Sequence, residues 1–321
     1  MTTEKPKQLW VDAYSPSSIE DCILPSSLKA QLTNILTKQD IPNLLLVGEA
    51  GTGKTTTARI LCDTLKVEML FINASSERGI NTIQSQVQGF ASSASLFSEA
   101  PYKAILLDEA DNLTPDAQKA LRGLVEQFQT QCRFILTCNY PQKLISPLRS
   151  RMTTIDFGFE AEQEQLKDDF YNRITSILEA EAVALTKDDE SALRHLVSHN
   201  YPNFRKCIHQ LQQSVVDDSI NADVIISSIP PSVDELVPLL HNYKMVEANN
   251  WLNHYFETTS NASCLNLIDA IFEALTPELT DDNISVIALT LGKYTDQATR
   301  GGNQKLLSLA MVAELTKVLS H

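Results

Sequence analysis

The sequence predicts an α/β fold: a parallel β-sheet domain with flanking helices, then a small helical domain and an all-helical C-terminal domain. Apolar runs alternate with helical patterns between residues 41 and 138, as in doubly wound sheets. A glycine-rich loop joins the first of these runs to a helix. From about residue 160 the periodicity is only helical, and prolines at 230–231 indicate a linker. These observations place the domain boundaries at 1–158, 159–230 and 231–321.

Local patterns predict the elements in order. Residues 8–25 carry aromatics and prolines, which predicts an extended arm, either a strap over the core or a lining for a nucleotide base. A helix is expected over 25–37. Strands are expected over 41–47, 67–73, 104–107 and 133–137, separated by helices over 55–65, 80–91 and 114–128, the last started by Thr114 and Pro115. Helices then follow over 161–181, 187–199 and 204–216, with about five more after 232.

Composition limits the functional classes. The chain has 321 residues, 43% of them hydrophobic, with no apolar run near the ~20 residues of a membrane span. Residues 1–7 are polar and do not resemble a signal peptide. The six cysteines include no C-x-x-C pair, which argues against structural zinc and a disulfide framework. We therefore expect a cytoplasmic protein with no membrane association, in the host cytoplasm if a phage encodes it.

The negative charge is concentrated in the second half of the chain. The net charge is −14 in total, of which residues 159–321 carry −13 and residues 1–158 only −1. An acidic chain is a poor candidate for nucleic-acid binding taken alone. Any contact with an anionic partner is therefore expected in the first half.

A phosphate-binding loop follows the first apolar run. Residues 48–55 read GEAGTGKT, which fits the pattern G-x-x-x-x-G-K-[ST] between a strand and a helix. Its glycines permit positive φ, and its N–H groups with the helix N-terminus form a cradle for anions. Lys54 is expected to reach the β- and γ-phosphates and Thr55 to hold Mg²⁺.

Polar residues end two later strands. Asp108 and Glu109 follow an apolar strand, where one carboxylate can hold Mg²⁺ and the other can deprotonate the attacking water. Asn139 ends the next strand, either as a turn residue or as a side chain facing the ligand crevice. Arg151 is either a solvated surface cation or an arginine that reaches a neighbour's γ-phosphate, and Arg205 is either a surface charge or a phosphate sensor.

Taken together, these motifs resemble the clamp-loader AAA+ ATPases over roughly residues 8–215. Residues 10–16 (WVDAYSP) are similar to the family's WVEKYRP arm, 73–80 (NASSERGI) to NASDDRGI, and 117–122 (AQKALR) to AQxALRR. Residues 135–140 (ILTCNY) match sensor 1, 150–152 (SRM) stand at the family's SRC, and 204–206 (FRK) resemble sensor 2. The resemblance is closest to the T4-type phage clamp-loader large subunit, then to archaeal and eukaryotic replication factor C small subunits. It implies an AAA+ P-loop domain, a helical lid and an oligomerising collar.

The resemblance also implies roles for single residues. Lys54, Thr55 and Asp108 would hold phosphate and Mg²⁺, with Glu109 as the base and Asn139 as sensor 1. Arg151 would act in trans on the ATP of the adjacent subunit, and Arg205 would act in cis as sensor 2. The expected nucleotide-binding residues are Val11, Asp12, Ala13, Tyr14, Ile23, Gly48, Glu49, Ala50, Gly51, Thr52, Gly53, Lys54, Thr55, Thr56 and Arg205. The expected switch and coupling residues are Arg78, Gln118 and Arg122, and Leu96 and Phe97 are the expected clamp-facing residues.

Several positions depart from the family pattern. Ser15 stands where the arm usually has arginine, so one nucleotide contact is missing or replaced. Gln84 and Gln88 stand where relatives place cations along the DNA backbone, Gly123 replaces a second arginine and Met152 replaces a cysteine. We therefore expect DNA binding with a weaker salt dependence than that of the relatives.

The resemblance implies an ATPase subunit of a sliding-clamp loader, with ATP and Mg²⁺ as cofactors. Its implied partners are copies of itself, four in number, with a distinct loader subunit, a sliding clamp and primer–template DNA contacted at its backbone. Three alternatives stand beside this: another ring ATPase such as a branch-migration motor, an RNA helicase signalled by residues 108–111 (DEAD), and a non-catalytic loader scaffold. The absence of a second helicase domain argues against the helicase, and the presence of Lys54, Asp108 and Glu109 argues against the scaffold.

Overall fold

The computed structural model describes residues 9–76, 79–93, 100–159, 162–216, 218–259, 262–280 and 283–319. The chain divides into two compact units, Met1–Ile220 and Asn221–His321. The first unit contains both the predicted sheet and the three helices that follow it. The division into units does not coincide with the domain boundaries expected after residues 158 and 230, so those boundaries remain predictions.

The first unit is built on a five-stranded parallel sheet, as predicted. Its strands lie in the order β2-β3-β4-β1-β5. They are β1 Leu44–Val47, β2 Met69–Asn73, β3 Lys103–Asp108, β4 Cys132–Cys138 and β5 Thr153–Asp156. The sequence did not predict β5, because only Ile155 of its four residues is buried and an edge strand of this kind has no apolar run.

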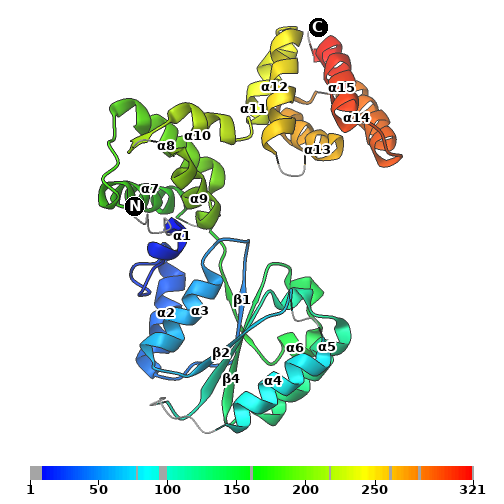
Figure 1. Ribbon diagram of the computed structural model, residues 1–321. Helices are drawn as coiled ribbons and strands as arrows, with labels where there is room; N and C mark the ends of the chain where they lie inside the picture. Colours follow the sequence, from blue (N-terminus) through cyan, green and yellow to red (C-terminus); the bar gives the residue numbers. More distant parts are fainter. Residues whose placement is uncertain are drawn as a thin grey trace, which may run out of the picture. The chain divides into compact units, whose positions relative to one another are not determined.

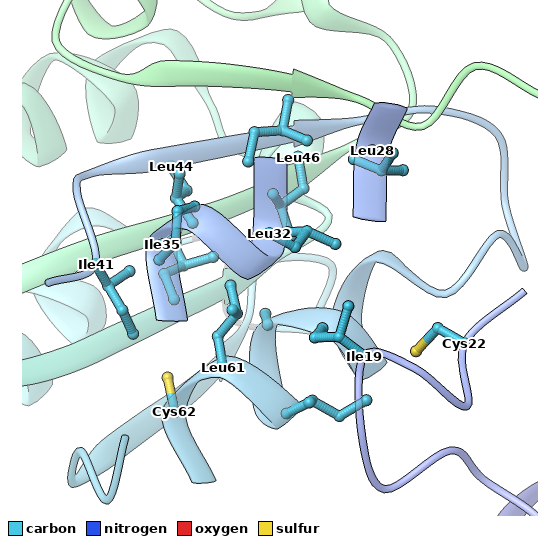
Figure 2. Packing of buried hydrophobic residues seen from close by; sticks show 14 of the residues in the cluster. Ile19, Cys22, Leu28, Leu32, Ile35, Ile41, Leu44, Leu46, Leu61 and Cys62 are labelled. Atoms are coloured by element: carbon cyan, nitrogen blue, oxygen red, sulfur yellow. The ribbon is translucent and has the colours of Figure 1, made fainter. Parts of the chain in front are cut away.

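Helices cover both faces of this sheet (Figure 1). Helices α2 (Ser26–Lys38) and α3 (Lys54–Thr64) pack on one face, and α4 (Ile80–Ser92) and α5 (Pro115–Gln127) on the other. Successive strand residues point to opposite faces, so Leu44 and Leu46 enter the first core and Leu45 enters the second. Figure 2 shows the first core, where residues of α2, α3 and β1 interdigitate. Burial on both faces explains the continuous apolar strands of the sequence.

Helix ends follow the sequence signals in part. Thr114 caps α5 as predicted, since its Oγ1 accepts a hydrogen bond from Ala117 N at 3.3 Å. The C-terminal end of α4 has a cap that the sequence did not reveal. The buried Lys103 Nζ, on β3, donates to Phe90 O at 2.9 Å and to Ser93 O at 2.6 Å. Lys103 thus supplies a cation to the C-terminal carbonyls of α4, where the helix dipole favours positive charge.

The arm before α2 and the connections after β3 and β4 contain short helices. The arm begins with a one-turn helix, α1 Trp10–Ala13, where the sequence analysis expected extended structure. The remaining short elements of the sheet domain are η1 Ala110–Asn112, η2 Pro141–Lys143 and α6 Ser146–Arg149.

The rest of the first unit is helical apart from one small hairpin. Its helices are α7 Gln163–Ala180, α8 Lys187–Asn200 and α9 Phe204–Ser214. Strands β6 Val215–Val216 and β7 Ser219–Ile220 pair antiparallel; the sequence analysis expected only helices here. An aromatic cluster joins these helices to the segment after β5, with Phe159 edge-on to both Tyr201 and Phe204.

The second unit is all-helical, as predicted, and has its own core. Its elements are α10 Ala222–Ser228, α11 Val233–His241, α12 Met245–Thr258, α13 Cys264–Leu275, η3 Thr276–Glu278, α14 Ile284–Thr299 and α15 Gln304–Leu319. Trp251 and Tyr255 stack in this core with their ring centroids 5.4 Å apart. Among the described residues, no helix has the length and apolar character needed to cross a membrane.

Candidate nucleotide-binding site

The loop after β1 has the backbone that its glycines predict. Gly51 and Gly53 have φ of +81° and +91°, in the left-handed region that favours glycine. A Cβ on Gly51 would also lie 2.0 Å from Asn203 Oδ1, whereas one on Gly53 would have no heavy atom within 4 Å. Asn203 caps α9 by accepting a hydrogen bond from Lys206 N at 3.0 Å. The phosphate-binding loop therefore lies against the start of the helix that carries Arg205.

Lys54 lies at the base of this loop with its ammonium group surrounded by oxygen atoms. Its Nζ donates to Gly48 O at 2.8 Å, Glu49 O at 2.6 Å and Asn139 Oδ1 at 3.0 Å. Burial lowers the pKa of Lys54, and this outweighs the opposing effect of nearby groups that include Asp108. Lys54 and Asn139, 85 positions apart in the chain, thus lie in one cluster, as expected if Asn139 faces the ligand crevice from the end of its strand.

Asp108 accepts hydrogen bonds from two hydroxyl groups. Its Oδ1 lies 2.5 Å from Thr55 Oγ1 and 2.8 Å from Thr137 Oγ1. The same Thr137 hydroxyl accepts a hydrogen bond from Glu109 N at 2.9 Å. Thr137, which is 2% exposed, therefore fixes both adjacent acids from the neighbouring strand. Thr137 was not predicted as a site residue, although a hydroxyl in a mostly apolar strand two residues before Asn139 was a usable signal.

Glu109 is held in an uncommon backbone conformation. Its φ is +55°, in the left-handed region that a residue with a side chain rarely adopts. Its Oε2 accepts a hydrogen bond from Asn112 Nδ2 at 3.1 Å. Behind it, the buried Asp111 accepts a long hydrogen bond from Asn139 N at 3.4 Å. The loop after β3 is thus tied to the loop after β4, which keeps Glu109 and Asn139 in a fixed relation.

These groups line a cavity of about 630 Å³ within the first unit. The predicted residues that line it are Val11, Asp12, Tyr14, Ile23, Ala50, Gly51, Thr52, Gly53, Lys54, Thr55, Thr56, Asp108, Glu109, Asn139 and Arg205. The lining residues that the sequence analysis did not assign to a ligand include Arg59, Thr137, Phe170, Arg173, Phe204 and His209. Most of the latter come from α3, α7 and α9. Thr137 and Phe204 lie inside the sensor 1 and sensor 2 motifs, whereas no motif marks Arg59, Phe170, Arg173 or His209.

The arm that borders the cavity is anchored to helices far away in the sequence. Trp10 N donates to Gln212 Oε1 at 3.1 Å, and Arg173 Nη2 donates to Tyr14 O at 3.0 Å. Tyr14 OH donates to Glu181 Oε1 at 2.7 Å, and this carboxylate raises the pKa of Tyr14. Arg173 therefore brings a cation to the arm beside Ser15, the position at which the resemblance led us to expect an arginine.

The predicted residues Ala13, Gly48 and Glu49 do not line the cavity, although the carbonyls of Gly48 and Glu49 accept hydrogen bonds from Lys54. The other predicted residues lie away from the cavity or outside the described residues. Gln118 is buried between α5 and α6, where it bonds Lys143 O at 3.1 Å and Ile145 N at 2.8 Å. Arg122 is exposed on α5, and Arg151 pairs with Glu126. The predicted switch and clamp-facing residues Arg78, Leu96 and Phe97 lie outside the described residues.

Comparison with known proteins gives the family of the chain. Residues 44–158 match the ATPase family associated with various cellular activities (AAA), and residues 162–225 match the sliding-clamp-loader large subunit AAA+ ATPase lid domain. The replication factor C small subunit of Methanococcus maripaludis is 30% identical over 317 residues, covering 95% of this chain and 98% of that protein. The same subunit of Archaeoglobus fulgidus is 31% identical over 320 residues, covering 96% and 97%. The chain belongs to the replication factor C small-subunit family.

This membership confirms the main functional prediction. The protein is an AAA+ ATPase subunit of the sliding-clamp-loader type, so it binds nucleotide and belongs to an oligomeric assembly with other loader subunits. A solved structure of the Thermotoga maritima RuvB Holliday junction branch migration motor aligns with a TM-score of 0.55 over 92% of this chain and 90% of that one. At 18% identity this likeness shows the fold alone. The branch-migration alternative therefore has no support beyond the shared fold.

Proposed function

We propose that the cavity holds ATP with Mg²⁺ and that the cycle of ATP binding and hydrolysis loads a sliding clamp onto primer–template DNA. The observation that carries this proposal is the cluster of Lys54, Thr55, Asp108, Glu109 and Asn139 at one end of the cavity. Lys54 would contact the β- and γ-phosphates, and Glu109 would accept the proton of the attacking water. Asn139 would orient the γ-phosphate or that water.

The donor set of the cluster fits Mg²⁺. Thr55 and Asp108 offer a hydroxyl and a carboxylate oxygen 2.5 Å apart, and such hard oxygens are the ligands that Mg²⁺ prefers. When bound, the ion would neutralise charge on the phosphate oxygens. Within the described residues no group of three or more His, Cys, Asp or Glu side chains is arranged to hold a metal, which favours an ion bound together with phosphates.

We assign the binding of the adenine base to the arm, residues 8–25. Val11, Asp12, Tyr14 and Ile23 line the cavity, and we assign them to the adenosine moiety. Ala13, expected among them, is exposed and does not line the cavity. Arg205, which also lines it from α9, would contact the phosphates in cis.

Arg151 is proposed to complete the site of a neighbouring copy. It does not line the cavity of its own chain, so it would act at the interface of a ring, for which we propose four copies of this chain with one distinct subunit. Contacts with primer–template DNA would run along its backbone. Since Gln84 and Gln88 carry no charge, the salt dependence of binding would be weaker than in relatives with cations there.

A complementation experiment tests the arrangement in trans. In the complete loader, Arg151→Ala and Glu109→Gln are each expected to reduce DNA-stimulated ATP turnover by about 10³-fold, with ATP binding retained. Mixing the two variants 1:1 in the assembly leaves roughly one interface in four with both an intact Glu109 and an intact Arg151, so turnover should return to a measurable fraction. Mixtures that stay inactive would show that Arg151 acts in cis, whereas full turnover of Arg151→Ala alone would show that Arg151 has no role in catalysis. The matched control is Arg149→Ala, which removes a neighbouring exposed arginine.

A further inference from the structure

The side chain of Arg151 is held in one pose by an acidic residue of another helix. Arg151 Nε donates to Glu126 Oε1 at 2.6 Å, and Nη2 contacts the same oxygen. On the other side, Nη1 donates to Pro147 O at 2.5 Å and makes a long contact of 3.5 Å with Ser150 Oγ. The Arg151 side chain remains 35% exposed, so it is restrained but still accessible.

These contacts leave the end of the guanidinium group available. An arginine has five N–H donors, one on Nε and two on each terminal nitrogen. The edge formed by Nε and Nη2 faces Glu126, and Pro147 O takes a donor of Nη1. The second N–H of Nη2 then has no acceptor among the described residues, and the second N–H of Nη1 has at most the long 3.5 Å contact with Ser150 Oγ. That pair has the spacing that binds two oxygens of one phosphate.

The position of Glu126 in α5 is not explained by helix stability. Glu126 lies in the last turn of α5, where negative charge opposes the helix dipole and where no basic residue compensates it. Its side chain is 50% exposed, so burial does not explain it either. Pairing with Arg151 gives this carboxylate its one polar contact among the described residues.

The two partners sit on elements that are fixed to each other. The Gln118 amide of α5 bonds Lys143 O and Ile145 N, immediately before α6. Arg151 follows α6 by two residues. The elements that carry the carboxylate and the guanidinium group are therefore tied together by hydrogen bonds of the buried Gln118 side chain.

A neighbouring arginine shows that the restraint is selective. Arg149 lies two residues before Arg151, is exposed, and has no hydrogen-bond or ion-pair partner among the residues that the structure describes. Of these two arginines in the same short segment, only Arg151 is paired with an acid among the described residues.

We infer that Glu126 is a positioning residue for Arg151. It holds the guanidinium group from the side and directs the two terminal N–H groups outward, so that they meet the γ-phosphate bound by the adjacent subunit without a further ordering of the side chain. This inference rests on the proposed role of Arg151 in trans. Glu126 itself touches neither nucleotide nor water.

The test measures DNA-stimulated turnover of the assembled loader with Glu126→Ala and Glu126→Gln chains. We expect kcat to fall roughly 10-fold for Glu126→Ala, with KM for ATP unchanged, because the site still binds ATP but the arginine is no longer pre-oriented. Glu126→Gln retains an oxygen acceptor for Nε and should recover part of the loss. An unchanged or increased kcat in Glu126→Ala would overturn the inference, since an increase would mean that the pair restrains an inactive arginine.

A double-variant comparison separates positioning from a structural effect. If Glu126 acts only through Arg151, the Glu126→Ala/Arg151→Ala double variant should turn over no more slowly than Arg151→Ala alone. A further loss in the double variant would overturn the inference. Arg149→Ala is the control for removing charge from this surface. If Arg151→Ala itself kept full activity, the proposed function in trans would fail; if Arg151→Ala were inactive and Glu126→Ala fully active, only the role of Glu126 would fail.

Discussion

Replacing Thr137 by valine is expected to weaken both adjacent acids of the site. The substitution keeps the shape of the side chain and removes the hydroxyl that bonds Asp108 Oδ1 at 2.8 Å and Glu109 N at 2.9 Å. Thr137 is 2% exposed and borders the cavity, so water can replace these contacts only from the cavity side. Leaving the buried N–H without its acceptor costs about 1–3 kcal/mol, and a hydrogen bond to a carboxylate contributes about 1.5–3 kcal/mol. We expect Thr137→Val to lower the free energy of unfolding of the first unit by about 2–4 kcal/mol.

Urea denaturation and ATP turnover measure the two consequences separately. The chain has two tryptophans, so a Trp251→Phe background leaves Trp10 as a fluorescent reporter of the first unit. If Asp108 holds Mg²⁺ as proposed, turnover should fall about 10- to 100-fold, as is usual when an outer partner of a metal ligand is removed. The matched control is Thr137→Ser, which keeps both hydrogen bonds and loses one buried methyl group, at about 1 kcal/mol.

The comparison between Thr137→Val and Thr137→Ser tests whether the hydroxyl group holds the two acids. If Thr137→Val were no less stable and no less active than Thr137→Ser, the hydroxyl would have no role in holding the acids. Reduced stability with normal turnover would limit its role to folding.

Three further predictions concern other parts of the first unit. Gly51→Ala should lower the free energy of unfolding of the first unit by about 1–3 kcal/mol more than Gly53→Ala does, as measured by urea denaturation. Both variants place alanine at positive φ, but only Gly51→Ala puts a Cβ against Asn203, the cap of α9. Lys103→Met should lower the free energy of unfolding by about 2–3 kcal/mol by removing the cap of α4, whereas the exposed Lys119→Met should change it by less than about 0.5 kcal/mol. Burial raises the pKa of Cys62 from 9.0 to about 12, so its thiol stays neutral in the native state while the unfolded chain ionises above pH 9. The stability that the neutral Cys62 thiol contributes is complete below pH 9 and is lost as the pH rises towards 12. In Cys62→Ala, the free energy of unfolding should therefore fall by about 2 kcal/mol less between about pH 9 and 11 than in the unsubstituted protein. An equal fall in both proteins would contradict this.

The sequence predicted the part of the site that depends on local chemistry. The loop of residues 48–55 and the acids after β3 lie within single motifs whose backbone and neighbours are nearly contiguous. Asn139 was also predictable, because the carboxyl ends of parallel strands meet at one edge of a sheet. The structure places Lys54 Nζ 3.0 Å from Asn139 Oδ1, in agreement with that expectation.

The parts that were missed depend on tertiary contacts. Thr137 is an ordinary strand residue until the register of β3 and β4 places it beside Asp108 and Glu109. Arg173 meets the arm across 159 positions of sequence, a pairing that no periodicity reveals. The edge strand β5 has one buried residue and no hydrophobic pattern. In each case the deciding information is which segments lie side by side, and that is a property of the whole fold.

The three oxygens around Lys54 have a consequence for ligand selectivity. Gly48 O, Glu49 O and Asn139 Oδ1 already satisfy the three protons of the ammonium group. A phosphate oxygen that approaches Lys54 has to compete with them, so binding is an exchange of partners whose net gain is the difference between two sets of contacts. A ligand without phosphates that reach this corner gains nothing from Lys54. The exchange also frees the amide of Asn139, so this side chain would respond to how far the polyphosphate extends.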